Sequence, residues 1–237
     1  MNRATQLADI QSRIAAACSK AGRPDSAVKL LAVSKTFPLS DILEFHSCGQ
    51  TSFGENYLQE ALDKITQLAD PPNAQTTGTH IDWHFIGPIQ SNKTKPIADN
   101  FSWVHSVDRL KIAQRLSDQR PANLPPLNVL VQINTSGEDS KSGVNPDQAI
   151  DLCMAIQGMK NLALRGLMTI PSNTDNTDQL KIEFLKCKSV FDALNVQGLK
   201  LDTLSMGMSA DLELAIECGS SCVRVGSALF GARDYSK

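Results

Sequence analysis

The sequence lacks any long apolar run. No stretch approaches the roughly 18 consecutive apolar residues that a membrane-spanning helix needs. Residues 1–22 carry Arg3, Asp9 and Arg13 among their apolar positions, and this pattern predicts an amphipathic helix rather than a signal peptide, which needs an uninterrupted apolar core. We therefore expect a cytoplasmic protein with no membrane partner.

Paired cysteine motifs are also missing. None of the six cysteines belongs to a CxxC pair. Cys218 and Cys222 are separated by Gly-Ser-Ser, which is typical of a turn, so we expect no metal site there. We interpret all six as small core residues of a reduced protein. They are Cys18, Cys48, Cys153, Cys187, Cys218 and Cys222.

Neither acidic nor basic residues are in large excess, and aromatic side chains are few. The formal net charge is -2, and aromatic residues make up 5% of the chain. No basic stripe interleaved with aromatics is present, which disfavours nucleic-acid binding. The basic residues at 92–95 are more typical of a solvated helix face. The 237 residues are close to the length of about 250 that one α/β barrel needs.

Short apolar runs alternate with longer amphipathic stretches from end to end. The expected strands are Leu30–Ser34, Thr51–Gly54, Trp83–Ile86, Trp103–His105, Val129–Asn134, Leu164–Met168, Thr203–Ser205 and Cys222–Val225. The expected helices cover residues 2–21, 40–48, 56–68, 91–99, 108–119, 146–157, 176–194 and 209–218. Ser40 and Ser209 can cap helices at their start, and Gly49 and Gly219 stand where helices should end.

This alternation predicts an α/β protein with a parallel sheet. Eight strands favour a closed (β/α)8 barrel of the TIM type, with residues 2–21 as an extra helix before the first strand. An open doubly wound sheet is the alternative, but its GxGxxG motif is missing after the first strand, where the chain reads SKTFPLS. The proline-rich pieces at 70–72 and 124–126 look like loops, so we expect residues 1–237 to form a single domain.

A lysine ends the first expected strand, in the stretch LLAVSKTFP. One interpretation of Lys35 is a snorkelling side chain whose charge reaches water. The other is a lysine at the mouth of a pocket that loses its proton and acts as a Schiff-base nucleophile. In a parallel barrel the chemistry gathers at the carboxyl ends of the strands, which is where Lys35 lies.

Two turns of small residues follow the last two strands. The segment from Ser205 through Met206, Gly207 and Ser209 precedes one expected helix, and Gly226-Ser227 opens another helical turn. Free backbone N–H groups, a favourable dipole and hydroxyls together make a good anion site. Phosphate sites in barrels often lie after strands seven and eight. Ordinary helix capping is the competing interpretation.

An arginine is expected to point into the barrel. In CVRVG, Val223 and Val225 point one way and Arg224 the other, because side chains alternate along a strand. A guanidinium inside the barrel needs an acceptor, either from an internal salt bridge or from a bound ligand. A carbonyl-reactive lysine, a phosphate cradle and an inward arginine together describe a pocket for pyridoxal 5'-phosphate.

Seven sequence blocks, spread over nearly the whole chain and in the family's order, resemble the pyridoxal phosphate homeostasis protein family (the YggS/PROSC type). The blocks are LLAVSKTFP, FGENYLQEALDK, WHFIGPIQSNKTK, VHSVDR, QINTSGEDSKSGV, LRGLMTIP and LSMGMSADLELAIECGSSCVRVGSALFGARDY.

The resemblance implies a fold type III barrel like the N-terminal barrel of alanine racemase, without the racemases' second domain. It implies that Lys35 forms the internal aldimine with the cofactor and that Arg224 faces the pyridine nitrogen. It places Asn56 beside the ring. On the phosphate it places Ser205, Met206, Gly207, Ser209, Gly226 and Ser227.

The expected function is pyridoxal phosphate homeostasis and cofactor supply, with indirect effects on amino-acid pools and no robust turnover. A racemase also needs a base on the second face of the substrate, and the only tyrosines are Tyr57 and Tyr235. An arginine at the ring nitrogen leaves that nitrogen unprotonated, which makes the ring a poorer electron sink. The alternatives are a racemase or lyase that uses this cofactor and a Schiff-base aldolase without it. We expect a monomer that contacts apo-enzymes transiently.

The four histidines are interpreted as structural. His46 lies on an expected helix and His80 in a polar loop, while His84 and His105 lie in or near short strands. No carboxylate or cysteine stands at ligand spacing from them, so no metal site is expected. The acidic pair at 138–139 lies in a loop that is solvated or covers the barrel mouth.

Overall fold

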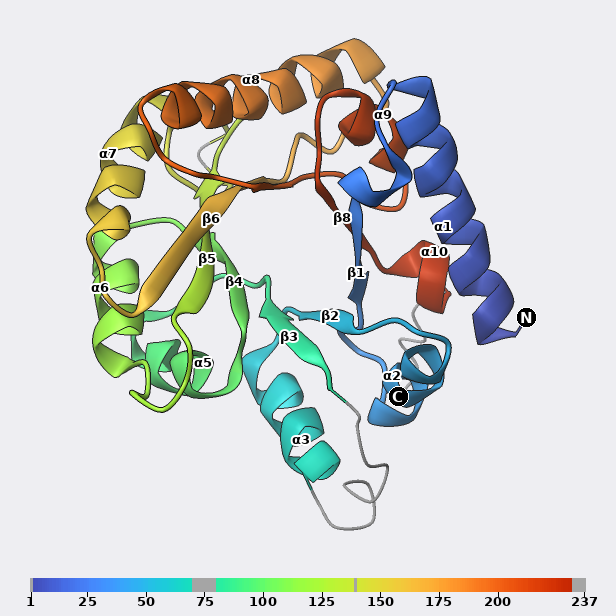
Figure 1. Cartoon of the computed structure of the whole chain (residues 1–237), viewed down its shortest axis with the longest axis horizontal. Helices are drawn as coiled ribbons and strands as arrows, with labels where there is room; N and C mark the ends of the chain where they lie inside the picture. Colours follow the sequence, from blue (N-terminus) through green and yellow to red (C-terminus); the bar gives the residue numbers. More distant parts are fainter. Residues whose placement is uncertain (1, 70–79, 139, 232–237) are drawn as a thin grey trace.

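In the computed structural model, which describes residues 2–69, 80–138 and 140–231, eight parallel strands close into a barrel (Figure 1). Each strand pairs with the next along the chain, and β8 returns to pair with β1. The strands are β1 (Lys29–Val33), β2 (Ser52–Glu55), β3 (Asp82–Phe85), β4 (Trp103–Val107), β5 (Leu127–Ile133), β6 (Leu162–Thr169), β7 (Thr203–Ser205) and β8 (Cys222–Val225).

Helices surround the barrel and connect its strands (Figure 1). They are α1 (Arg3–Lys20), α2 (Leu39–Ser47), α3 (Leu58–Ala69), α5 (Thr94–Asn100), α6 (Leu110–Gln119), α7 (Pro146–Gln157), α8 (Thr177–Val196), α9 (Leu212–Glu217) and α10 (Ser227–Phe230), with 3-10 turns η1 (Asp25–Ala27) and η2 (Ser91–Lys93).

The strands form because their apolar residues are buried both against the helices and inside the barrel. In β5 the three consecutive residues Val129, Leu130 and Val131 are all fully buried. A strand buried on both faces has this continuous apolar run, as expected for parallel sheets. In β8 the buried Val223 and Val225 flank Arg224, so the strand period turns the arginine inward.

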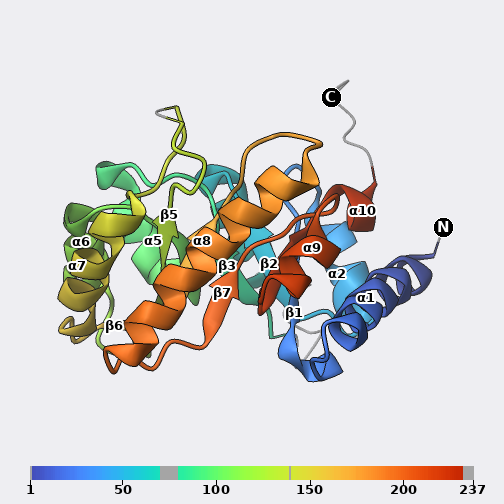
Figure 2. The same ribbon diagram turned by 90° about the horizontal axis from the view of Figure 1, so that it is seen from above.

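The two ends of the barrel differ (Figure 2). The loops that follow β5 and β6 lie at the upper end in this view, and the segment around η1, which leads into β1, lies at the lower end. The amphipathic α1 packs outside the barrel beside α9 and α10, with Leu7, Ile10 and Ile14 buried. The upper end is where the strands finish, so it carries the functional residues expected of a barrel.

The closed (β/α)8 barrel confirms the predicted fold and excludes the open sheet. All eight strands occur where expected, with boundaries shifted by two residues or fewer. Gly49 and Gly219 have φ of 100° and follow helix ends as predicted. Among the described residues, no helix is both long and apolar enough to cross a membrane.

The predicted capping roles of Ser209 and Ser40 were wrong. The helix after β7 begins at Leu212, because the Met208 N–H donates to the carboxylate of Asp211 and holds a turn before it. Ser209 lies in that turn. Ser40 is inside α2, whose N-cap residue is Pro38.

Five of the six cysteines are buried, all six are free thiols, and burial raises the pKa of Cys153 and of Cys187 to about 12.

Candidate cofactor site

Lys35 lies two residues after the end of β1, at the upper end of the barrel, half-buried in a tight turn. The Ser34 N–H donates to the Gly54 carbonyl of β2 at 3.0 Å, and the turn closes with a bond from Phe37 N–H to Ser34 O at 3.1 Å. Thr36 has φ of 70°, a left-handed conformation that is a clear outlier for a β-branched residue. The backbone beside Lys35 is therefore strained, as is common at functional sites.

A buried ion cluster supports this turn from below. The Lys64 ammonium, 4% exposed, donates to Glu55 Oε1 at 2.8 Å and to the Ser34 carbonyl at 3.0 Å. The Ser34 hydroxyl donates to the same Glu55 oxygen at 2.6 Å. Burial raises the pKa of Glu55, while Lys64 and Ser34 pull it back down. Glu55 Oε2 is buried without a hydrogen-bond partner among the described residues.

The cluster also reaches the residue after Lys35. Glu60 accepts from Lys64 at 2.6 Å and from the Thr36 N–H at 2.6 Å. The sequence interpretation missed this cluster. One signal was present, because Glu60 and Lys64 stand four residues apart on a helix facing the end of β1, a spacing at which charges pair.

Arg224 points into the barrel as predicted and is 4% exposed. Its Nη1 donates to the Ser205 carbonyl at 2.8 Å and to the Ser205 hydroxyl at 2.7 Å, and its Nη2 donates to the Thr169 carbonyl at 2.9 Å. Burial lowers the pKa of Arg224. Its Nε has no acceptor within the described part of the chain, so one donor remains for a ligand.

Two histidines continue this network across the barrel interior. His105 Nδ1 lies 3.1 Å from the Ser205 hydroxyl, and His105 Nε2 lies 2.9 Å from His84 Nδ1. Burial lowers the pKa of His84 to about 3 and that of His105 well below its usual value. Both rings are therefore neutral at pH 7. They are members of the Arg224 network.

The two small-residue turns meet at the upper end of the barrel. The Ala228 N–H, in the first turn of α10, points at the Ser209 hydroxyl at 3.4 Å. Ser227 is exposed and Ser209 half-buried. Gly207 has φ of 95°, and a Cβ there would lie 2.5 Å from the Ala215 side chain. Gly207 is therefore required by the turn itself.

Two predicted phosphate contacts have other partners. The Ser205 hydroxyl is fully buried and engaged with Arg224 and His105. Met206 is buried in the core, its N–H donates to Cys222 O at 3.2 Å, and its carbonyl accepts from the Ser220 hydroxyl at 2.7 Å. Their contacts therefore do not support direct roles on a phosphate, because sequence adjacency to Gly207 does not make them accessible.

Asn56 lines a cavity of about 200 Å³ at the barrel mouth, together with Gln132, Lys141 and Ile170 from the ends of β5 and β6. The chain approaches itself closely here, since a Cβ on Gly87 would lie 2.1 Å from the Asn56 carbonyl oxygen. The position of Asn56 is thus held by the loop after β3, and its role beside a cofactor ring stays a prediction.

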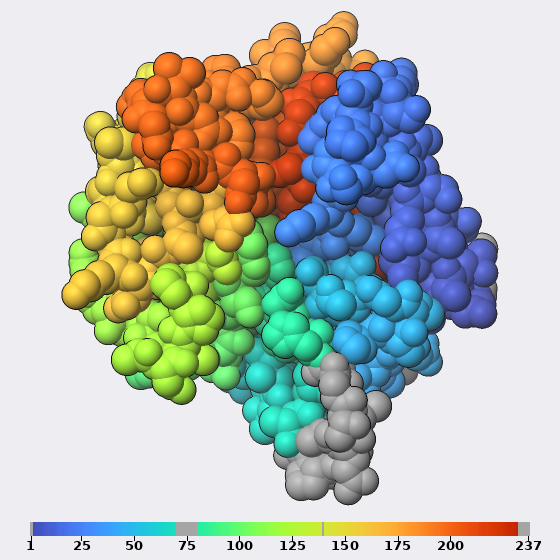
Figure 3. Space-filling view, in the orientation of Figure 1, coloured from blue at the N-terminus to red at the C-terminus, as the bar shows by residue number. Residues whose placement is uncertain are grey.

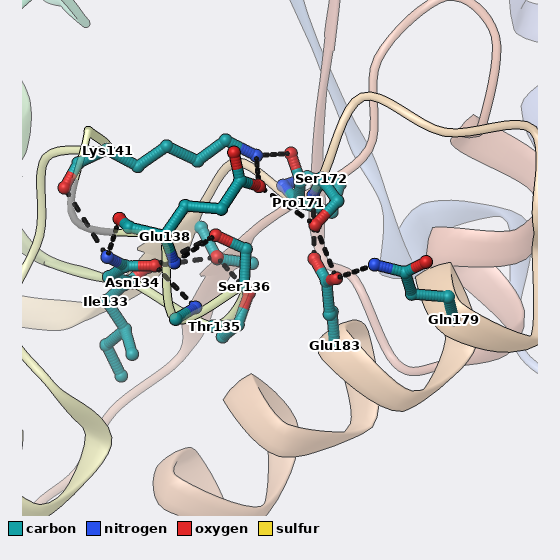
Figure 4. Close-up of polar contacts among 12 residues, drawn as sticks. Ile133, Asn134, Thr135, Ser136, Glu138, Lys141, Pro171, Ser172, Gln179 and Glu183 are labelled. Atoms are coloured by element: carbon teal, nitrogen blue, oxygen red, sulfur yellow. Dashed lines mark hydrogen bonds and ion pairs between the residues drawn. The ribbon is translucent and has the colours of Figure 1, made fainter.

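The loop after β5 is tied to the loop after β6 at this mouth (Figure 4). Lys141 pairs with Glu138 at 2.9 Å and donates to the Pro171 carbonyl at 2.8 Å. The Ser172 hydroxyl lies 3.1 Å from Glu138 and 2.7 Å from Glu183 of α8, and the Ser172 N–H donates to Glu183 at 2.7 Å. Position 139 lies outside the described residues. The expected acidic loop is therefore a bonded part of the rim.

Comparison with known proteins gives concordant matches. The family model described as "Alanine racemase, N-terminal domain" matches residues 5–234. A pyridoxal phosphate homeostasis protein of Pseudomonas aeruginosa is 55% identical over 98% of this chain and 96% of its own length. One of Pasteurella multocida is 52% identical over 98% and 97%.

A solved structure extends the comparison to three dimensions. The structure of PipY of Synechococcus elongatus with PLP bound has a TM-score of 0.80 and 31% sequence identity, and the match covers 97% of this chain and 100% of that one. Fold and sequence therefore agree over nearly the full length of both chains.

Proposed function

The chain belongs to the alanine racemase N-terminal domain family and, within it, to the pyridoxal phosphate homeostasis proteins, and from this premise we propose that it binds pyridoxal 5'-phosphate and serves its intracellular homeostasis. The full-length likeness to a structure with PLP bound is the observation that carries this function. Supply of the cofactor to other enzymes would affect amino-acid pools indirectly.

The residues of the site fit this cofactor. A Cβ on Gly226 would meet Val33 at no less than 3.5 Å, an ordinary contact, and its φ of -113° lies outside the left-handed region. Contacts within the protein therefore do not require glycine here, and close approach of an external group such as a phosphate would give a reason for it. The Nε of Arg224 is a second feature, because it is a donor without an acceptor among the described residues.

Each residue of the site receives a role from its place. Lys35 is the covalent anchor, and Ser209, Gly226 and Ser227 hold the phosphate at the meeting point of their turns. Arg224 donates from Nε to the ring nitrogen, and Asn56 lies beside the ring. Ser205 positions Arg224 rather than the phosphate, and Met206 with Gly207 forms the turn beneath Ser209.

When bound, pyridoxal phosphate supplies a reactive aldehyde and an electron-withdrawing ring. Arg224 can only donate, so it leaves the ring nitrogen without a proton and weakens that ring as an electron sink. Tyr57 is 51% exposed and lines a groove with Leu58 and Pro88. Tyr235 lies outside the described residues. The arginine at the ring nitrogen favours a carrier over a racemase or lyase.

The remaining expectations complete the proposal. Residues 1–237 act as one cofactor-binding domain, as a cytoplasmic monomer that meets apo-enzymes transiently. Carriage does not need a paired base from a second subunit. A carrier retains and releases its cargo without moving a proton on a substrate.

Borohydride reduction followed by peptide mapping tests the anchor. A pyridoxyl group should be fixed on Lys35 in the loaded protein, whereas Lys93, an exposed lysine of η2, should stay unlabelled. The Lys35→Ala variant should lose the label and keep part of its affinity through the phosphate contacts, since each charge-assisted hydrogen bond contributes about 1.5–3 kcal/mol. Stoichiometric labelling at Lys141 would refute the site.

Transfer to an acceptor tests the function. Loaded protein mixed with an apo-transaminase, in the presence of a trap for free aldehyde, should restore transaminase activity. Exchange of deuterium into the α-carbon of amino acids should stay at background in the same mixture. Racemisation by the loaded protein at enzymatic rates, without any transfer, would instead establish the enzyme alternative.

A further inference from the structure

A separate cavity of about 250 Å³ opens at the lower end of the barrel, where the strands begin. Lys29 of β1, Ser52 of β2 and Trp103 of β4 line it, and none of the residues proposed to hold the cofactor does. Figure 3 shows this face, on which the start of β1, in blue, approaches the segment before β7, in orange. The cavity is thus distinct from the mouth that carries Lys35.

A buried histidine lines this cavity with one ring nitrogen to spare. His84 is 7% exposed, and its ring stacks on Trp103 with centroids 5.3 Å apart and planes within 4°. Its Nδ1 is bonded to His105, while its Nε2 has no partner among the residues that the structure describes. This nitrogen is not among the fully buried unpaired atoms of the described residues, so it is accessible to a ligand or to solvent in the cavity.

The hydrogen bonds from Arg224 to His84 set which ring nitrogen of His84 carries the proton. Arg224 can only donate, so the Ser205 oxygen accepts from it. If the Ser205 hydroxyl then donates to His105 Nδ1, the His105 Nε2–H donates to His84 Nδ1, and His84 carries its proton on Nε2. If His105 donates to Ser205 instead, every bond reverses and His84 Nε2 is a bare acceptor.

The position of the charges decides between the two directions. The fully buried Arg224 stands at one end of the chain, and the exposed Lys29 at the other. A buried charge acts through a lower dielectric and is screened far less than an exposed one. Arg224 therefore orients these hydrogen bonds. Each acceptor lone pair points toward the guanidinium, and each donated proton points away from it. His84 then presents an N–H to the cavity.

The other polar groups of the cavity add one net positive charge. Arg165 pairs with Asp202 through two hydrogen bonds and stacks over Trp103 at 5.3 Å, so these two charges cancel. Lys29 makes no ion pair with a described residue. The apolar part of the wall comes from Leu30 and Leu31. A donor histidine, one unbalanced ammonium and an apolar wall match a monoanion with a hydrocarbon body.

We propose that this cavity is a second binding site, for a small monocarboxylate, in which the ligand accepts from His84 Nε2–H and pairs with Lys29. The carboxylate binds at the lower end of the barrel while the cofactor occupies the upper end. Binding is specific for the charged form of the ligand, because a neutral amide of the same shape leaves the Lys29 ammonium unpaired.

Titration of the cofactor-loaded full chain with benzoate, and separately with benzamide, tests the site. The readout is the ring nitrogen signals of His84 in long-range proton–nitrogen NMR spectra of ¹⁵N-histidine-labelled protein. The unliganded spectrum should show the proton on Nε2. Benzoate should shift the His84 signals saturably, with those of the half-buried His46 and the exposed His80 unchanged. Benzamide should bind at least about tenfold more weakly, a difference of about 1.4 kcal/mol.

Lys29→Gln should weaken benzoate binding at least about tenfold, since it removes the unbalanced charge from an exposed position without touching the fold. Lys200→Gln is the matched control, because Lys200 is exposed, precedes β7 and does not line the cavity, and it should bind as the unchanged protein does. Equal binding of benzamide and benzoate, no effect of Lys29→Gln, or shifts that spare His84 would each overturn the proposal.

Discussion

The Lys64 ammonium lies 3.0 Å from the carbonyl oxygen of Ser34, the residue immediately before the proposed anchor Lys35. The same ammonium lies 2.6 Å from Glu60 Oε1, which accepts from the N–H of Thr36, the residue immediately after it. One buried cation thus holds the backbone on both sides of Lys35. Lys64 lies on α3, and its side chain reaches the end of β1.

Lys64→Met should destabilise the protein by about 3–5 kcal/mol, because it leaves the Glu55 carboxyl buried without its cation. Urea unfolding followed by circular dichroism measures the change. The double variant with Glu55→Gln should recover much of the loss, since a neutral amide needs no counter-charge. Lys95→Met, which breaks the exposed pair with Asp99, is the control and should cost less than about 1 kcal/mol.

Thr36→Gly should raise the free energy of unfolding and weaken cofactor retention at the same time. A β-branched residue at φ of 70° is strained, and glycine adopts that conformation without a Cβ clash. Strain of about 1–3 kcal/mol is partly offset by the greater freedom of glycine in the unfolded chain. Thermal melts and the dissociation rate of the cofactor measure the two effects. Thr36→Ala, which keeps the Cβ, should gain no stability, and equal gains in both variants would show that strain is not the cause.

The barrel could be predicted from the sequence because its evidence is local. The apolar run from Val129 to Val131 predicts a buried strand directly. The alternation around Arg224 predicts which way its side chain points. The start of α9 was misjudged because it depends on one side chain, Asp211, that accepts from Met208 N–H and holds a turn where the pattern already looked helical.

The site could be predicted only in part, because several of its bonds join residues far apart in the chain. The contact of Ser205 with His105 spans 100 positions, and that of Arg224 with Thr169 spans 55. No periodicity reports such pairs. Because Ser205 is adjacent to the proposed phosphate turn, the sequence suggested a contact with the phosphate. Its burial beside Arg224 instead supports a role in positioning the guanidinium.

The stability of the protein should fall as the pH drops below about 6.5, the ordinary pKa of histidine. His84 has a pKa of about 3 in the folded state, so below 6.5 the unfolded chain binds a proton that the folded chain rejects. Stability is thus lost between about pH 6.5 and about 3, by roughly 1.4 kcal/mol per pH unit for each such histidine, and His105 shifts in the same direction. Urea unfolding at several pH values gives the slope. His84→Gln should flatten it, and His80→Gln, at an exposed ring, should leave it unchanged.

Alanine at Gly207 should lower the stability of the protein, whereas alanine at Gly226 should lower its affinity for the cofactor. At Gly207 the φ of 95° and a Cβ 2.5 Å from Ala215 make the variant unstable whether or not cofactor is present. At Gly226 the nearest protein atoms lie 3.5 Å from the new Cβ, so the apo-protein should melt almost normally while its affinity for pyridoxal phosphate falls. Melting curves with and without cofactor separate the two. Normal cofactor affinity in Gly226→Ala would place the phosphate elsewhere.

Ser205→Ala and Ser227→Ala should weaken cofactor binding by different routes, which inorganic phosphate distinguishes. Ser227 is exposed at the first turn of α10, so its loss should lower the affinity for free phosphate and for the cofactor together. The Ser205 hydroxyl is buried between Arg224 and His105, so its loss should leave phosphate affinity unchanged and weaken the cofactor through a misplaced guanidinium. Phosphate competition against cofactor loading measures both affinities. Ser205→Ala should also shift the ring nitrogen signals of His105, which a loss of a phosphate contact alone would not move. A matching drop in phosphate affinity for both variants, with His105 unchanged, would return Ser205 to the phosphate site and leave Arg224 positioned by its two carbonyl acceptors alone.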